Sequence, residues 1–148
     1  MEDAEFAPIV IGKLMNIGGA LQRKANKLLS PFGFNQQQYA ILFEIYKAEK
    51  VCQKTMVNRL LLEKAHVSKI IGKLKSLGLI EITVSSEDKR SSWISITPEG
   101  KEIVKQCQAS YVNWNKEWIG KIDNSRRQSM LDDLSMLQSI FKENIQNE

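Results

Sequence analysis

The sequence has few of the residues that build metal centres and disulfide frameworks. It contains one histidine, His66, and two cysteines, Cys52 and Cys107, in 148 residues. The cysteines lie 55 positions apart and form no CxxC pair or other metal-ligand spacing. These absences argue against a zinc site and against a disulfide-stabilised secreted domain. We therefore expect a cytoplasmic protein that needs no metal and no cofactor.

Long apolar runs are also missing. No run of about 18 apolar residues occurs, which is the length that a membrane-spanning helix requires, so the sequence predicts no membrane span. The first ten residues, MEDAEFAPIV, are acidic and lack the basic flank of a signal peptide. With 43% hydrophobic and 26% charged residues, the composition is typical of a folded domain rather than a disordered chain.

Motifs of common enzymes are absent as well. The sequence has no Gly-rich phosphate loop, no GxSxG, no HExxH and no carboxylate–histidine pair. We therefore predict no catalytic residues and no enzymatic activity.

What is present is an uneven distribution of charge. Residues 1–50 carry six Lys or Arg against five Asp or Glu, and residues 98–148 carry seven against eight. Residues 51–97 carry eight against four, so this middle third holds the whole net charge of +4. A basic middle between nearly neutral flanks is typical of a nucleic-acid-binding module within a helical frame. An unevenly charged solvated surface is the alternative.

The N-terminal part of the chain predicts two helices. The first runs from about Ala7 to Leu29 and is stopped by Ser30-Pro31. Asn35 opens the second, with Gln38 three residues later as in a capping box. The first helix carries one narrow apolar stripe at heptad-like spacing, formed by Val10, Leu14, Ile17, Leu21 and Leu28.

The middle of the chain predicts a helix-turn-helix followed by two strands. Thr55 can cap a brief helix, and a further helix runs from about Lys64 to Leu77, with Gly78 as its C-terminal cap. Residues 79–84 and 92–96 then alternate apolar and polar side chains, as half-buried strands do.

The C-terminal part predicts two long amphipathic helices. Residues 97–100, Thr-Pro-Glu-Gly, form a helix start with a Thr N-cap and a Pro at the first helical position. A last helix follows Asp123. The apolar stripes at both ends of the chain exceed what one small domain can cover, so we expect them to pack against a second copy.

The predicted fold is therefore mainly α with a small two-stranded β wing (α+β). It is a winged helix-turn-helix with long N- and C-terminal dimerisation helices. We divide one integrated domain into an N-terminal dimerisation helix (1–34), a winged helix-turn-helix DNA-binding region (35–97) and C-terminal dimerisation helices (98–148).

The helix that begins at Lys64 is the candidate recognition helix. If Val67, Ile70 and Leu74 face inward, its basic and small polar residues lie on or near the outer face. A major groove about 12 Å wide admits such a helix. A plain solvated face is the alternative. The candidate DNA contacts on this helix are Lys64, Ala65, His66, Ser68, Lys69 and Lys73.

The connection between the two strands holds a second candidate site, in the segment Glu87-Asp88-Lys89-Arg90. Lys89 and Arg90 can reach DNA from the tip of a hairpin, since arginine suits the negative potential of a narrow minor groove. Asp88 would orient Arg90 through a charge-assisted hydrogen bond. We expect Arg90→Ala to weaken DNA binding by roughly 1–3 kcal/mol. An ordinary charged turn is the alternative.

From Thr55 through Gly100 the chain resembles the MarR family of bacterial winged-helix transcriptional regulators. The resembling pieces are TMVNRLLLEKAHVSKIIGKLKSLGLI, the Asp88-Lys89-Arg90 element that matches the family's D-x-R, and ISITPEGKEIV. The resemblance implies a homodimer whose recognition helices enter successive major grooves of a pseudo-palindromic double-stranded operator, about 34–36 Å apart. It also implies a sequence-specific regulator, usually a repressor, that many family members release from DNA on binding a small, frequently phenolic effector or on cysteine oxidation.

Two residues depart from the family pattern. Leu61 stands where the turn between the two helices usually carries glycine, and Glu63 replaces the small polar N-cap of the recognition helix. Leucine resists the left-handed backbone conformation that glycine permits, so the turn is expected to be built differently.

Effector sensing has two candidate locations. The family's ligand pocket lies between the winged module and the dimerisation helices, where several aromatic residues of this chain could line it or simply belong to the core: Tyr39, Tyr46, Trp93, Tyr111 and Trp114. Alternatively, Cys52 lies near Lys50 and Lys54, which would favour its thiolate, whereas Cys107 falls on an apolar stripe.

The alternative functions are therefore a redox-responsive regulator acting through Cys52 or Cys107, and a winged-helix protein-interaction module without DNA binding. A steep dependence of duplex binding on salt would separate DNA binding from protein binding, because phosphate contacts release counterions.

Overall fold

The computed structural model of the chain describes residues 1–84, 87 and 92–147. The predicted wing contacts Asp88, Lys89 and Arg90 lie outside the described residues.

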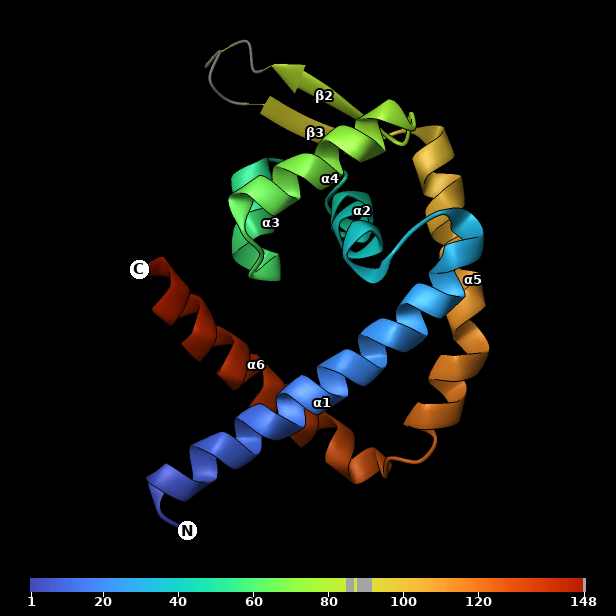
Figure 1. The fold of residues 1–148 in the computed structure, drawn as a ribbon. Helices are drawn as coiled ribbons and strands as arrows, with labels where there is room; N and C mark the ends of the chain where they lie inside the picture. Colours follow the sequence, from blue (N-terminus) through green and yellow to red (C-terminus); the bar gives the residue numbers. More distant parts are fainter. Residues whose placement is uncertain (85–86, 88–91, 148) are drawn as a thin grey trace.

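The chain forms a winged helix-turn-helix module from which long helices extend (Figure 1). Its element order confirms the predicted mainly α fold with a β hairpin as the wing. The elements are α1 (Asp3–Leu29), the 3-10 turn η1 (Ser30–Phe32), α2 (Gln36–Ala48), β1 (Lys50–Val51), α3 (Gln53–Leu60), α4 (Lys64–Ser76), β2 (Ile80–Val84), β3 (Ser92–Ile96), α5 (Pro98–Ile119) and α6 (Asn124–Gln146).

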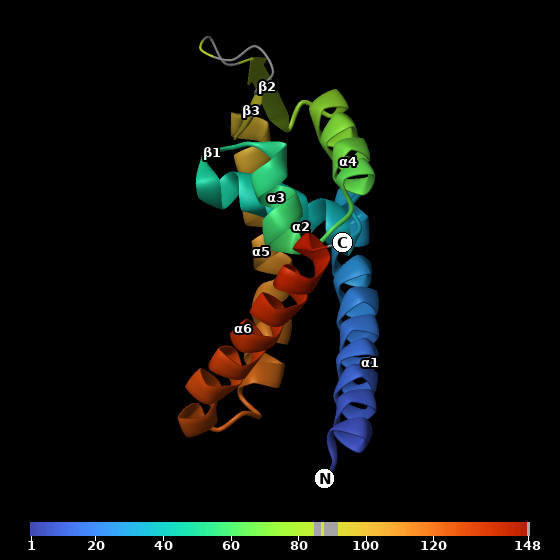
Figure 2. The same cartoon turned by 90° about the vertical axis from the view of Figure 1, so that its left-hand side faces the viewer.

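The hydrophobic core lies inside the winged module and at the adjoining ends of α1 and α5. Only Ala25 and Leu29 of α1 are buried, and α6 has no buried residue among those described. Figure 2 shows that α1 and α6 lie outside the winged module and separate from each other with increasing distance from it. The fully buried side chains are Leu29, Ile41, Leu42, Ile45, Met56, Val67, Leu74, Val104 and Cys107.

Local capping signals fix several of these helix ends as predicted. The Asn35–Gln38 capping box is formed, because Gln38 N donates to Asn35 Oδ1 at 2.9 Å and Asn35 N donates to Gln38 Oε1 at 3.0 Å. Thr97 caps α5 by accepting from Gly100 N at 3.0 Å. Gly78 follows α4 with φ +72°, a left-handed conformation that glycine adopts without a steric penalty.

Three details of the predicted fold were wrong. Helix α1 begins at Asp3 instead of Ala7, with Asp3 and Glu5 in its first turn, where acidic side chains favour the helix dipole. Helix α3 begins at Gln53 with Cys52 as its N-cap, so Thr55 lies inside the helix and does not cap it. The sheet has a third strand, β1, which pairs antiparallel with β3 and is too short to show an alternating pattern.

The wing hairpin has the expected register, with Ile80 opposite Ile96 and Ile82 opposite Ile94. Ile80 and Ile94 are buried, whereas Val84 is 64% exposed. The apolar residues of the alternating pattern are therefore buried at the base of the hairpin, whereas the one at the end of β2 is exposed.

The stretch Asp3–Phe32 is long and apolar enough to cross a membrane, judged by length and composition alone. One such helix is weak evidence, because a helix that packs against protein can have the same composition. The absence of an unbroken apolar run thus did not by itself exclude a span. Lys13, Arg23, Lys24 and Lys27 lie within this stretch, and charged side chains are costly inside a bilayer.

Candidate nucleic-acid interface

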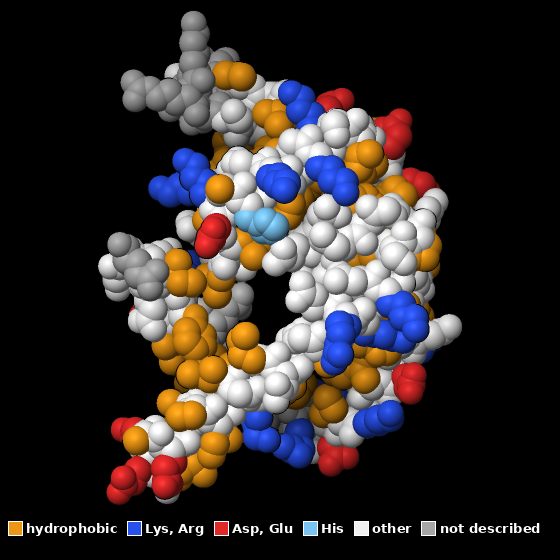
Figure 3. All heavy atoms as spheres, viewed as in Figure 1, with side chains coloured by type: hydrophobic (Ala, Val, Ile, Leu, Met, Phe, Trp, Pro, Cys, Tyr) orange, Lys and Arg blue, Asp and Glu red, His pale blue; other side chains and the backbone are white. Residues whose placement is uncertain are grey.

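Helix α4 is held by one apolar face and presents the opposite face to solvent. Val67, Ile70, Ile71 and Leu74 are buried. Figure 3 shows Lys and Arg side chains gathered over the region of α4 around the single histidine. The predicted contact residues that are exposed are Lys64, Ala65, Ser68, Lys69 and Lys73.

His66 differs from its neighbours because it is half-buried against α2. Its Nε2 makes a hydrogen bond to Gln37 Oε1, and in the tautomer that carries a proton on Nε2 the histidine is the donor. The ring thus ties the first turn of α4 to the start of α2. His66 can reach DNA from this position only by giving up or sharing this bond.

Gln53 anchors the same end of α4 from α3. Its Nε2 donates to Lys64 O at 3.4 Å and also to Ser68 Oγ. Sequence reasoning missed both Gln37 and Gln53, since an isolated glutamine carries no signal of its tertiary partner. Together the two glutamines orient the part of α4 that holds most of the predicted contacts.

The turn between α3 and α4 keeps the left-handed conformation even though it contains leucine. Leu61 has φ 53° and ψ 38°, whereas the expectation was that leucine would force a different turn. Such a conformation costs a non-glycine residue on the order of 1–2 kcal/mol. Glu63 is the N-cap of α4 and makes no side-chain capping bond, as its poor capping ability predicts.

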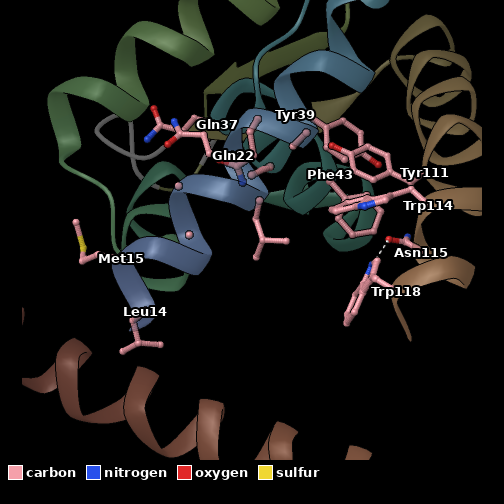
Figure 4. A pocket seen from close by; sticks show the side chains of 16 residues that line it. Leu14, Met15, Gln22, Gln37, Tyr39, Phe43, Tyr111, Trp114, Asn115 and Trp118 are labelled. Carbon is pink, nitrogen blue, oxygen red and sulfur yellow. Dashed lines mark hydrogen bonds between the residues drawn. The ribbon is translucent and has the colours of Figure 1, made fainter. Parts of the chain in front are cut away.

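A cavity of about 750 Å³ lies between α1, α2 and α5 (Figure 4). Among the five aromatic candidates, Tyr39, Tyr111 and Trp114 line it, whereas Tyr46 and Trp93 do not. The lining comprises Leu14, Met15, Gly18, Gly19, Leu21, Gln22, Ala25, Gln36, Gln37, Tyr39, Ala40, Phe43, Tyr111, Trp114, Asn115 and Trp118.

One wall of this cavity is a continuous series of aromatic rings. Tyr39 stacks on Tyr111 with ring centroids 5.8 Å apart, and Tyr111 meets Trp114 at 6.0 Å. Burial raises the pKa of Tyr39 to about 12 and also raises the pKa of Tyr111. Both phenols therefore stay neutral hydrogen-bonding groups at physiological pH.

The two cysteines have opposite environments. Cys52 Sγ lies 3.1 Å from Thr55 Oγ1, and this hydrogen bond is the main cause that lowers the pKa of the Cys52 thiol. Burial raises the pKa of Cys107 to about 11. The pKa of Cys52 is thus lowered, as predicted, but the cause is its hydrogen bonding to Thr55 and not the charge of the neighbouring lysines.

A second hollow, of about 460 Å³, surrounds Cys52 at the base of the wing. It is lined by Lys47, Lys50, Arg59 and Trp93 among others, and Lys50 Nζ lies 5.0 Å from the centroid of the Trp93 ring. Lys47 and Arg59 both contact Glu44, which offsets part of the positive charge. In the described part of the chain, no three His, Cys, Asp or Glu side chains lie together as a metal site would require.

Comparisons with known proteins agree with this geometry. Residues 32–91 match the family model described as MarR family. The HTH-type transcriptional regulator YhbI of Bacillus subtilis is 25% identical over 132 residues, which cover 86% of this chain and 86% of YhbI.

Two solved structures share the fold. A mutant of MarR from E. coli, complexed with operator DNA, has a TM-score of 0.77 and 21% identity, and the match covers 90% of this chain and 95% of that one. CouR from Rhodococcus jostii, bound to p-coumaroyl-CoA, has a TM-score of 0.78 and 25% identity, over 86% of this chain and 91% of that one.

The order of elements, the three-stranded sheet and the outward face of α4 define a winged helix-turn-helix protein of the DNA-binding kind. Within that class, the chain is similar to the MarR family of transcriptional regulators, whose family model it matches over residues 32–91.

Proposed function

We propose that the protein is a homodimeric, sequence-specific DNA-binding regulator that represses transcription until a small effector releases it. The observation that carries the proposal is the outer face of α4. Five of the predicted contact residues are exposed there, on a helix that is fixed by its buried face and by Gln53. A helix positioned in this way fits a major groove, with its lysines on phosphates or guanine edges.

The proposed DNA contacts are those predicted from the sequence. Lys64, Ala65, Ser68, Lys69 and Lys73 face the groove, and His66 joins them if its bond to Gln37 opens. Asp88, Lys89 and Arg90 complete the interface from the wing, an assignment that rests on the sequence alone. The operator complex of MarR supports this docking mode, because that protein has the same fold.

The homodimer is proposed from the unpartnered apolar surfaces of α1 and α6. Phe6, Ile9 and Ile17 on α1 and Leu134 and Phe141 on α6 are each between 42% and 56% exposed. Apolar surface of this extent on two long helices is typical of a face that another chain covers. Residues 1–34 and 98–148 would then form the dimer, and residues 35–97 the DNA-binding region.

The effector is proposed to occupy the cavity between α1, α2 and α5. Its volume of about 750 Å³ lies within the range for small-molecule sites, and the site adjoins both the winged module and the helices expected to dimerise. The complex of CouR with p-coumaroyl-CoA supports an aromatic effector for the fold. The proposal includes no enzymatic activity, metal or cofactor, and places the protein in the cytoplasm.

Fluorescence anisotropy tests the proposal directly. The protein is titrated with duplex from its own upstream region and with a scrambled duplex, at about 0.05 and 0.2 M salt. Tighter binding to the native duplex, with a steep loss at the higher salt, is the expected result. Equal, weak and salt-insensitive binding to both would instead favour a protein-interaction module.

A redox-responsive regulator is the second candidate, favoured by the lowered pKa of Cys52. Treating the protein with about one equivalent of hydrogen peroxide before the same titration separates the two candidates, because the thiolate is the form of cysteine that peroxide oxidises. Loss of DNA binding that Cys52→Ser prevents would favour redox control. Unchanged binding would leave effector control as the proposal.

A further inference from the structure

The cavity between α1, α2 and α5 has a consistent chemistry. Figure 4 draws the 16 side chains that line it, and none of them is charged. Its polar groups are the amides of Gln22, Gln36, Gln37 and Asn115 together with phenol and indole groups. Trp118 Nε1 already donates to Asn115 Oδ1 at 3.1 Å. The site therefore offers neutral hydrogen bonds and no counter-ion.

The shape of the cavity suits a flat ring. Tyr39, Tyr111 and Trp114 form its aromatic wall, with Tyr39 and Tyr111 only 18° from parallel. Across from α2 and α5, helix α1 contributes Gly18 and Gly19, where an added Cβ would meet nothing within 4 Å. A ring can thus stack against the aromatic wall while it approaches the backbone of α1.

A negatively charged ligand does not fit this lining. A carboxylate taken from water into the cavity would find no cation among the lining side chains, and burying an unpaired charge is strongly unfavourable. Tyr39 and Tyr111 stay protonated, because burial raises the pKa of both phenols. The lining therefore favours an uncharged ligand over a carboxylate.

Gln37, on α2, lines the cavity and also contacts α4, the helix proposed to read DNA. Its Oε1 is hydrogen-bonded to His66 Nε2 on α4. Figure 4 places it on the side of the cavity away from the aromatic wall. A ligand whose hydroxyl donates to Gln37 Oε1 competes with His66 for that oxygen, so its binding favours the state in which the bond to α4 is broken.

We propose that the cavity takes an uncharged aromatic molecule and that Gln37 detects it at the expense of its hydrogen bond to His66. This rests on the proposed function, because it specifies the effector class and the route by which the effector acts on DNA binding.

The ligand class is tested by isothermal titration calorimetry with methyl 4-hydroxybenzoate and 4-hydroxybenzoate, which differ in charge at neutral pH. We expect the ester to bind at least about tenfold more tightly. Trp114→Ala is expected to abolish ester binding, and the matched control Trp93→Ala, outside the cavity, is expected to preserve it. Equal or tighter binding of the acid, or no ester binding up to about 1 mM, would overturn the assignment.

The relay is tested by measuring how far the ester weakens operator binding, as the ratio of duplex Kd with and without it. For the parent protein we expect a ratio of about five or more, within the usual range of allosteric coupling. Gln37→Leu should bring the ratio close to one. Gln36→Leu is the matched control, because this adjacent glutamine lines the same cavity and should leave the ratio high.

An unchanged ratio in Gln37→Leu, with ester still bound by calorimetry, would overturn the relay. If the parent bound no native duplex, the proposed function and the relay would both fail. The calorimetric comparison of ester and acid would still decide the ligand class, so the two failures are distinguishable.

Discussion

Thr97 Oγ1 donates to Gly78 O at 2.7 Å and accepts from Gly100 N at 3.0 Å. One hydroxyl thereby joins the residue that ends α4 to the first turn of α5. Thr97 is 7% exposed, and among the described residues it is the one polar side chain that is buried. The Thr97 side chain thus connects the C-terminal end of α4 to the N-terminal end of α5, the long helix expected to dimerise.

Thr97→Val should lower the free energy of unfolding by about 2 kcal/mol, because it removes a helix cap and leaves the Gly78 carbonyl without its donor. Thr97→Ser keeps both hydrogen bonds and should lose less than half as much. Urea denaturation followed by circular dichroism measures both variants. Equal losses in the two would show that the methyl group, not the hydroxyl, stabilises this junction.

Gly100→Ala should destabilise the protein by more than about 2 kcal/mol, although alanine is usually the better helix residue. A Cβ at Gly100 would lie 2.2 Å from Leu79 O and 2.7 Å from Ile96 Cγ1, so the backbone would have to shift.

Gly72→Ala is the control for this substitution, since a Cβ at Gly72 in α4 meets nothing within 4 Å. It should stabilise the protein by up to about 1 kcal/mol. Thermal unfolding of both variants gives the comparison. A stabilised Gly100→Ala variant would mean that α5 starts farther from β2 than described.

Iodoacetamide should alkylate Cys52 well before Cys107. The pKa of Cys52 is lowered chiefly by its hydrogen bond with Thr55, so at neutral pH a larger fraction of Cys52 is thiolate than of a cysteine with an ordinary pKa. Cys107 is fully buried and its pKa is raised to about 11, so it stays a protonated thiol at neutral pH. Time-resolved mass spectrometry identifies the modified residue.

Thr55→Val should move the pH dependence of Cys52 alkylation toward higher pH, because it removes the hydrogen bond that favours the thiolate. An unshifted rate profile would assign the reactivity of Cys52 to another cause.

Lys69→Ala should weaken duplex binding by about 1 kcal/mol and lower the salt slope by about 1, as loss of one phosphate contact does. Lys121→Ala is the control. Its ammonium forms an exposed pair with Glu117 at 3.8 Å, at the α5–α6 end of the molecule far from the wing (Figure 1). Anisotropy titrations over a salt series compare the two. Equal slopes would remove Lys69 from the interface.

The sequence predicted best the features that are encoded locally. The Asn35 capping box, the Thr97 cap and the Gly78 helix end each depend on residues within three or four positions of one another, and all three are formed. Strand β1 escaped detection because two residues cannot show a period. Thr55 was misplaced because Cys52, a rarer N-cap residue, begins α3 instead.

The candidate site was predictable only in part, because some of its contacts join residues that are far apart in the sequence. The exposed residues of α4 followed from its 3.6-residue period. The bond between Gln37 and His66 joins residues 29 positions apart, and no local pattern indicates it. The cavity likewise takes its lining from three helices, so aromatic composition suggested Tyr39 and Tyr111 but equally suggested Tyr46.

The direct junction at Thr97 has a mechanical consequence. Helix α5 follows β3 with no loop between them, and its 22 residues make a rod of about 33 Å at about 1.5 Å per residue. A tilt of about 5° at the far end of such a rod displaces the base of the wing by roughly 3 Å. In an assembly of two copies, the angle between the two α5 helices would set the distance between the two winged modules.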